Sequence, residues 1–308
     1  MKKASSVEES ALRPFVSTFS KRGLVEICIN TPTELWLEFD TGEWKHEKNA
    51  DITESAMKEL VTTFATISGQ KFNRHNPSFS GRIPFKNTML RVEAVMGSSV
   101  EGGFALSIRV GRASIYPLES YMSKSEADAL KQYIISGKTL MVNGATGTGK
   151  TTLANSMITH IPHRERILTI EDTRELIVPH PNVLHRLVSK NGTDEGKVDY
   201  VDIINQATRL RPDRILLGEI DIGNTMPFLK LCNTGHEGGL STIHAADADQ
   251  AFDTLCLNAG LAGVEGSKSD IEQYAKKAIH GFVSIKKTRE GNKRVFRATL
   301  DMLNTKER

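Results

Sequence analysis

The chain has 308 residues, a net charge of +3, and 39% apolar and 25% charged residues. This length allows two domains, and the near-balanced charge gives no reason to expect nucleic-acid binding. The three cysteines, Cys28, Cys232 and Cys256, lie far apart, which argues against a disulfide scaffold or a four-cysteine zinc site and fits a reducing cytoplasm. We see neither a signal peptide nor an apolar run of about 18 residues, so we expect any membrane role to come through partners.

The first third of the chain predicts a small α+β domain. Strand-like patterns and one stretch of helical apolar spacing follow each other in the order strand, strand, helix, strand, strand. The strands are expected at 24–29, 35–39, 89–96 and 103–110, and the helix at 52–68. We therefore expect an N-terminal domain over residues 1–110 and a linker over 111–122.

Residues 123–308 predict an α/β domain, because strands and helices alternate along them. Strands are expected at 139–143, 166–171, 183–189, 214–220 and 239–244, and helices at 124–136, from residue 150, near 199–209 and near 224–233. This alternation indicates a parallel sheet covered by helices on both faces. The last strands form a hairpin whose basic residues we assign to a solvated turn rather than to a binding patch: Lys286, Lys287, Arg289, Lys293 and Arg294.

Residues 144–151 match the phosphate-binding pattern G-x-x-x-x-G-K-[ST] in full, between an expected strand and an expected helix. The glycines let backbone N–H groups surround phosphate oxygens, and the helix adds its positive end. Lys150 can reach the β- and γ-phosphates, and the Thr151 hydroxyl can bind Mg²⁺. The predicted ATP-binding residues are Gly144, Ala145, Thr146, Gly147, Thr148, Gly149, Lys150, Thr151 and Thr152.

Carboxylates at two strand ends are the candidates for catalysis. Glu219 follows the apolar strand that begins at Arg214, and Gly218 stands where many P-loop enzymes have aspartate. Glu171 ends another strand, with Asp172 and Glu175 close behind it. Such groups can orient the attacking water or bind near Mg²⁺. An alternative for the second cluster is a helix-capping turn with Asp172 as its N-cap.

A third group of polar residues surrounds the strand at 239–244. His236 lies in a glycine-rich segment before the strand, and His244 follows Thr242-Ile243 at its end. Two histidines suggest a metal, but no further Cys or His has ligand spacing. We expect instead that His244 bonds to a phosphate and responds to its loss.

Four segments together resemble the secretion-superfamily ATPases, and most closely the traffic ATPases of type IV secretion and conjugative transfer. The segments are GATGTGKTT, ILTIEDTREL, RLRPDRILLGEI and NTGHEGGLSTIHA, within residues 144–245. The resemblance implies a P-loop NTPase domain of the RecA-like type and a smaller N-terminal α+β domain. It also implies a homo-hexamer that hydrolyses ATP with Mg²⁺ at the cytoplasmic face of the inner membrane, in contact with inner-membrane components of the secretion machine.

The resemblance also assigns roles to single residues. Glu175 in the acidic box and Glu219 in the Walker B strand are the acidic catalytic residues, with Thr151 and Glu219 at the metal and His244 in the histidine box. Arg109 matches an arginine at the end of the N-terminal domain that reaches the γ-phosphate. Arg112 is a second match for it, and Glu171 is a further catalytic candidate.

The chain differs from the family pattern at Asp221, where arginine is usual after the Walker B glutamate. This difference keeps open a nucleotide-gated docking module with little turnover as an alternative to a motor. A motor for pilus extension or retraction is a second alternative, although those enzymes usually have Asp-Pro after the acidic-box glutamate, where this chain has Asp172 and Thr173. A DNA translocase is disfavoured, since no base-stacking aromatic cluster is present.

Overall fold

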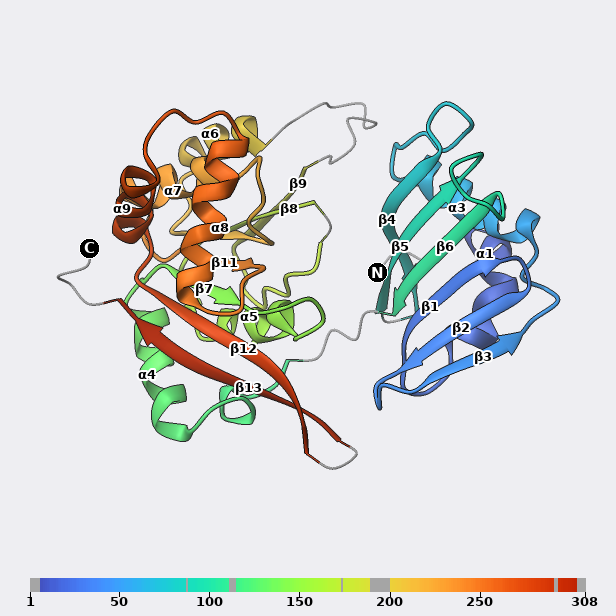
Figure 1. Cartoon of the computed structure of the whole chain (residues 1–308), viewed down its shortest axis with the longest axis horizontal. Helices are drawn as coiled ribbons and strands as arrows, with labels where there is room; N and C mark the ends of the chain where they lie inside the picture. The colour runs from blue at the N-terminus through green and yellow to red at the C-terminus, as the bar shows by residue number, and fades with distance from the viewer. Residues whose placement is uncertain are drawn as a thin grey trace. The chain divides into compact units, whose positions relative to one another are not determined.

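The structure is a computed structural model that describes residues 6–86, 88–110, 115–172, 174–188, 200–290 and 293–303. These residues form two compact units, which divide between residues 110 and 115. Each unit contains one sheet (Figure 1). Each unit also buries apolar residues of its own. Arg112 and residues 111–114 of the expected linker lie outside the described residues.

The first unit is built on a six-stranded antiparallel sheet in the order β3-β2-β1-β6-β5-β4. Its elements are α1 (Ser6–Leu12), a 3₁₀ turn (Arg13–Phe15), α2 (Val16–Phe19), β1 (Leu24–Thr31), β2 (Glu34–Phe39), β3 (Trp44–Lys48), α3 (Glu54–Ile67), β4 (Ser78–Phe85), β5 (Thr88–Met96) and β6 (Phe104–Val110).

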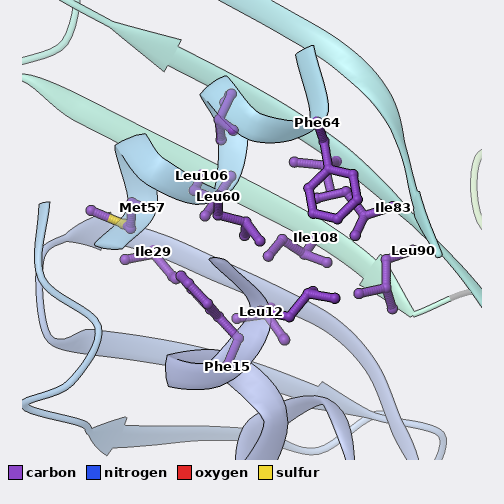
Figure 2. Packing of buried hydrophobic residues seen from close by; sticks show 14 of the residues in the cluster. Leu12, Phe15, Ile29, Met57, Leu60, Phe64, Ile83, Leu90, Leu106 and Ile108 are labelled. Carbon is purple, nitrogen blue, oxygen red and sulfur yellow. The ribbon is translucent and has the colours of Figure 1, made fainter. Parts of the chain in front are cut away.

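Helix α3 supplies much of the core of this unit. The Thr53 hydroxyl accepts from the Ala56 N–H at 3.2 Å and caps the first turn. Met57, Leu60 and Phe64 recur at helical spacing and are buried. Figure 2 shows these side chains directed toward Ile29, Leu106 and Ile108 of the sheet. The expected α+β pattern is present, with two more strands than the sequence indicated.

Strands β3 and β4 were not predicted because neither has the usual strand pattern. In β3, the sequence WKHEK is almost wholly exposed and has no apolar alternation. Strand β4 contains Gly81 and Pro84, which both disfavour a strand. Both strands lie at the edges of the sheet. An edge strand tolerates proline and needs no second buried face.

The second unit contains a seven-stranded sheet in the order β13-β12-β7-β11-β10-β8-β9. Its elements are a 3₁₀ turn (Leu118–Ser120), α4 (Lys124–Ile135), β7 (Leu140–Asn143), α5 (Lys150–Ile158), β8 (Ile167–Glu171), β9 (Val183–Leu187), α6 (Tyr200–Arg209), β10 (Arg214–Leu217), α7 (Thr225–Asn233), β11 (Leu240–Ile243), α8 (Ala248–Leu261), α9 (Lys268–Ala278), β12 (Gly281–Glu290) and β13 (Lys293–Met302).

Helices cover both faces of this sheet, as the alternation of elements predicted. Strands β12 to β9 are parallel, and only β13 runs antiparallel to its neighbour. Within β10, Leu216 packs into the core that contains Leu130 of α4 and Leu153 of α5. Its neighbour Leu217 packs on the opposite side, in the core that contains Phe228 of α7. The C-terminal hairpin was expected, but its pairing with β7 was not.

The segment just before α4 is packed against the second unit. Leu118, Tyr121 and Met122 are buried in the core beside α4 and α5. Ile115 and Tyr116, just before them, are exposed. Among the described residues, no helix has both the length and the apolar character needed to cross a membrane.

Candidate nucleotide-binding site

The predicted site residues of the second unit meet because four parallel strands end at one edge of the sheet. The phosphate loop follows β7, the acidic segment follows β8, Glu219 follows β10 and His244 follows β11. The carboxyl edge of a parallel sheet is where α/β proteins bind ligands. The fold thus brings together segments that are up to 100 residues apart in sequence.

The phosphate loop has the backbone that its glycines permit. Gly147 and Gly149 have φ angles of 72° and 86°, which residues other than glycine rarely adopt. A Cβ on Gly144 would lie 2.6 Å from the Ile285 carbonyl oxygen of β12. Gly149 is the N-cap of α5, so the helix begins directly at Lys150. The loop therefore opens onto the positive end of a helix.

Lys150 is 8% exposed, and its Nζ holds the loop together. This atom donates to the carbonyl oxygens of Gly144 at 2.9 Å and Ala145 at 3.1 Å, and it lies 3.2 Å from His244 Nδ1. Burial lowers the pKa of Lys150, and the Glu219 charge acts in the opposite direction. The ammonium group thus lies at the loop with two carbonyl oxygens and one imidazole nitrogen around it, a setting that suits an incoming phosphate.

His244 joins Lys150 to Glu219. Because an ammonium group only donates, His244 Nδ1 accepts from Lys150, and the ring carries its proton on Nε2. Nε2 lies 3.9 Å from Glu219 Oε2, and Thr146 Oγ1 lies 3.4 Å from Nδ1. Burial and the Lys150 charge lower the pKa of His244. The neutral form is therefore favoured at neutral pH.

The acidic segment reaches the phosphate loop through Thr151. The Thr151 hydroxyl donates to Glu175 Oε2 at 3.3 Å. Glu171 is 1% exposed, and its Oε1 accepts from the N–H groups of Glu175 at 2.6 Å and Leu176 at 2.7 Å. Residues 174–182 form no helix, so the helix-capping alternative for Asp172 is wrong.

The absence of a side chain at Gly218 leaves space for the Glu171 side chain. A Cβ on Gly218 would lie 3.2 Å from the Glu171 Cγ. Any side chain at this position would press on the buried Glu171 side chain at its Cγ. The departure from the aspartate of many P-loop enzymes thus has a packing reason, and Glu219 is the carboxylate that β10 brings to the site.

The two histidines of the third group lie at opposite ends of β11. His244 is at the carboxyl end, and His236 is in the loop before the amino end. At that amino end, Arg214 pairs with Glu165 and fills the space beside Gly238, where a Cβ would collide with its guanidinium. His236 therefore does not share the site of His244.

Asp221 has a local partner in the loop before α7. Its Oδ1 accepts from the Asn224 N–H at 3.1 Å, and its own N–H donates to Asn224 Oδ1 at 3.0 Å. Asn224 Nδ2 also donates to the Glu219 carbonyl oxygen at 3.0 Å. Asp221 therefore stabilises the turn that follows Glu219, and an arginine could not make the same bond to an N–H group.

Arg109 lies on β6 of the first unit. It is directly opposite Arg91 on one neighbouring strand and Glu26 on the other, and its Nη2 is 3.4 Å from Glu26 Oε2. Arg82 is in turn opposite Arg91. Three arginines thus lie in one row across the sheet, with Arg91 Nε 3.6 Å from Glu93 Oε1 and Arg109 beside Glu26. The sequence did not reveal this row, because it arises from strand register.

Comparison with known proteins identifies the family of this chain. The family described as "Type II/IV secretion system protein" matches residues 19–260. The type IV secretion system protein PtlH of Bordetella pertussis is 34% identical over 278 residues, which cover 80% of this chain and 79% of that protein. The type IV secretion system protein VirB11 of Bartonella quintana is 30% identical over 301 residues, covering 84% and 83% of the two chains.

A solved structure shows a similar fold. The ATPase DotB of Legionella pneumophila is 17% identical, with a TM-score of 0.67 over 100% of this chain and 84% of that one. The family match covers most of the chain, and the phosphate loop and carboxylates lie at one edge of the sheet as a nucleotide hydrolase requires. The chain belongs to the type II/IV secretion system protein family and is one of its ATPases.

Proposed function

We propose that this ATPase binds ATP at residues 144–152 in a RecA-like P-loop domain and powers substrate transfer in a type IV secretion or conjugation system. The observation that carries the proposal is the chain of contacts from Lys150 through His244 to Glu219, at the mouth of the phosphate loop. The sequence relatives PtlH and VirB11, both described as type IV secretion system proteins, support the choice of machine.

The loop supplies most of the binding energy for ATP. Backbone N–H groups of residues 144–149 and the start of α5 surround the phosphates, and Lys150 contacts the β- and γ-phosphates. On this proposal the Lys150 Nζ exchanges the carbonyl oxygens of Gly144 and Ala145 for phosphate oxygens. His244 then loses its lysine partner at Nδ1, and its ring can turn so that the Nε2–H donates to the γ-phosphate. This exchange makes His244 sensitive to the nucleotide.

The carboxylates act on water and on the metal. The Thr151 hydroxyl and the Glu175 carboxylate are hard oxygen donors 3.3 Å apart, a donor set that fits Mg²⁺ held by few protein groups and by phosphate oxygens. Bound Mg²⁺ would neutralise charge on the phosphates. Glu219 orients the attacking water and accepts its proton, and Glu175 fixes the Thr151 hydroxyl. Arg109, in the arginine row of the first unit, supplies positive charge to the γ-phosphate of the nucleotide.

Function in a secretion machine implies an assembly. We propose a homo-hexamer at the cytoplasmic face of the inner membrane that contacts inner-membrane components of the machine and does not bind nucleic acid directly. The domains of this proposal are an N-terminal α+β domain over 1–110 and an ATPase domain over 123–308. Residues 111–122 join them, and within this segment Leu118, Tyr121 and Met122 pack into the core of the second unit. A change of angle at this junction would convert hydrolysis into movement.

Two glutamine variants test the catalytic roles. Glu219→Gln and Glu175→Gln keep size and hydrogen bonding but remove charge. Because the loop binds the nucleotide, we expect ATP affinity within about tenfold of wild type and a loss of turnover of roughly 100-fold or more. Glu237→Gln, an exposed glutamate before the amino end of β11, is the matched control and should keep its activity. Normal turnover in both site variants would refute these assignments.

A further inference from the structure

Asn155 is a buried polar residue on α5 that the catalytic proposal does not use. Its side chain is 5% exposed. Its Nδ2 donates to the Glu175 carbonyl oxygen at 3.1 Å, and its Oδ1 accepts from the Ile177 N–H at 2.8 Å. One amide thus forms two hydrogen bonds with the backbone of the acidic segment, as a neighbouring strand would.

The segment needs such partners because it has no regular structure. Residues 174–180 are in neither a helix nor a strand. Glu171 Oε1 accepts from the N–H groups of Glu175 and Leu176, and Asn155 satisfies the next N–H and one carbonyl. Four backbone groups of residues 175–177 are therefore held by two buried side chains. Buried backbone groups of this kind are rarely left without a partner.

Asn155 also projects from the same side of α5 as Thr151, the last residue of the phosphate loop motif. It follows Thr151 by four residues, so both side chains project from the same face of α5. Thr151 contacts the Glu175 carboxylate while Asn155 contacts the Glu175 carbonyl. The same helix face thereby fixes both ends of Glu175 relative to Lys150, which begins the helix.

We propose that Asn155 and Glu171 are positioning residues that hold the Glu175 carboxylate at the Thr151 hydroxyl. This inference rests on the role proposed above for Glu175. Glu171, although acidic, acts on this view as an acceptor for two N–H groups and not as a base. A displacement of about 1 Å at a reacting group can reduce a rate by roughly 100-fold, so the two side chains matter for the rate more than for binding.

Asn155→Ala tests the first residue, with Asn233→Ala as the matched control. Asn233 is also a helix asparagine whose Nδ2 donates to a backbone carbonyl, that of Tyr274, but it lies at the end of α7. We expect Asn155→Ala to lower kcat by about tenfold or more, to leave KM for ATP within about threefold, and to raise the Mg²⁺ concentration needed for half-maximal activity. Asn233→Ala should change none of these. Unchanged kcat and Mg²⁺ dependence in Asn155→Ala would overturn the proposal.

Two further measurements separate positioning from other roles. Glu171→Gln keeps an oxygen acceptor for both N–H groups, so its turnover should stay within about fivefold of wild type. A loss as large as that of Glu175→Gln would make Glu171 a catalytic carboxylate and overturn its assignment. When Glu175→Gln is already present, adding Asn155→Ala should lower turnover only slightly further, because Asn155 acts through Glu175.

The same set of variants separates this inference from the proposed function. Full activity of Glu175→Gln would remove the role proposed for Glu175 itself. A slow Glu175→Gln together with an additive effect of Asn155→Ala would leave that role intact and refute only the positioning by Asn155. Thermal midpoints of all variants identify any loss that comes from unfolding.

Discussion

At the scale of single residues, the site is organised by the contact between Lys150 and His244. The motif predicted both residues, but not that the ammonium would donate to the imidazole and to two carbonyl oxygens of its own loop. Local sequence shows which groups are present, whereas their partners depend on how β7 and β11 are aligned in the sheet. For the same reason, the sequence did not predict that Glu171 is buried.

The Lys150–His244 contact predicts a pH dependence of stability in the nucleotide-free protein. The pKa of His244 lies below its ordinary value of 6.5. Burial of the ring is the larger cause, and the positive charge of Lys150 is the second. The folded state therefore binds fewer protons than the unfolded chain, so the free energy of unfolding falls as the pH drops from 6.5 through the folded pKa. Above 6.5 both states are neutral at this residue and the effect is absent.

His244→Asn keeps an oxygen acceptor for Lys150 but cannot be protonated. We expect its thermal midpoint to fall less than that of wild type between about pH 7.5 and pH 5. His160 and His185 also have lowered pKa values, but they are present in both proteins and cancel in the comparison. The control is His75→Asn in an exposed loop, which should follow the wild type. Identical pH profiles for wild type and His244→Asn would contradict the contact.

At the scale of elements, the sequence predicted helices and strands well where apolar residues recur at regular spacing. Helix α3 and the buried strands β7, β8, β10 and β11 were expected close to their observed bounds. The sequence analysis missed the N-terminal helices α1 and α2, the edge strands β3 and β4, and the pairing of β12 with β7. Edge strands lack a buried second face, and strand pairing between distant segments leaves no local pattern. The contact of Gly144 with Ile285 of β12 is a consequence of that unpredicted pairing.

The burial of the residues before α4 predicts which residue is the first to contribute to the stability of the second unit. Leu118 is 0% exposed in the core, whereas Ile115 is 42% exposed. We expect Leu118→Ala to lower the free energy of unfolding by about 2–5 kcal/mol, through lost burial and a cavity. Ile115→Ala, a matched apolar truncation three residues earlier, should change it by less than about 0.5 kcal/mol. Denaturant titration of the full chain measures the free energy of unfolding of both variants. Equal losses in the two variants would mean that Leu118 is not part of the folded core of the second unit.

At the scale of the whole molecule, the two compact units carry different parts of the proposed chemistry. The phosphate loop and carboxylates are in the second unit, and the arginine row of Arg82, Arg91 and Arg109 is in the first. The sequence indicated two domains through a change of pattern near residue 110. Assembly of copies depends on surfaces that carry no comparable motif, so the hexamer follows from the family resemblance alone.

The proposed hexamer should form more readily when nucleotide is bound. We expect mass measurements with a non-hydrolysable ATP analogue and Mg²⁺ to show a six-subunit species, since ligand binding favours the state that binds it. Lys150→Ala should form less of this species at the same nucleotide concentration. A monomer with full activity at every concentration would refute the ring.

The most direct test of ATP hydrolysis at this site is steady-state phosphate release by wild type, Lys150→Ala and the control Lys230→Ala, an exposed lysine of α7. The phosphate loop contains no second cationic side chain, so we expect Lys150→Ala to lose turnover to background while Lys230→Ala matches the wild type. Turnover in the wild type also excludes a docking module that barely hydrolyses ATP. Undiminished turnover in Lys150→Ala would contradict the assignment of the site.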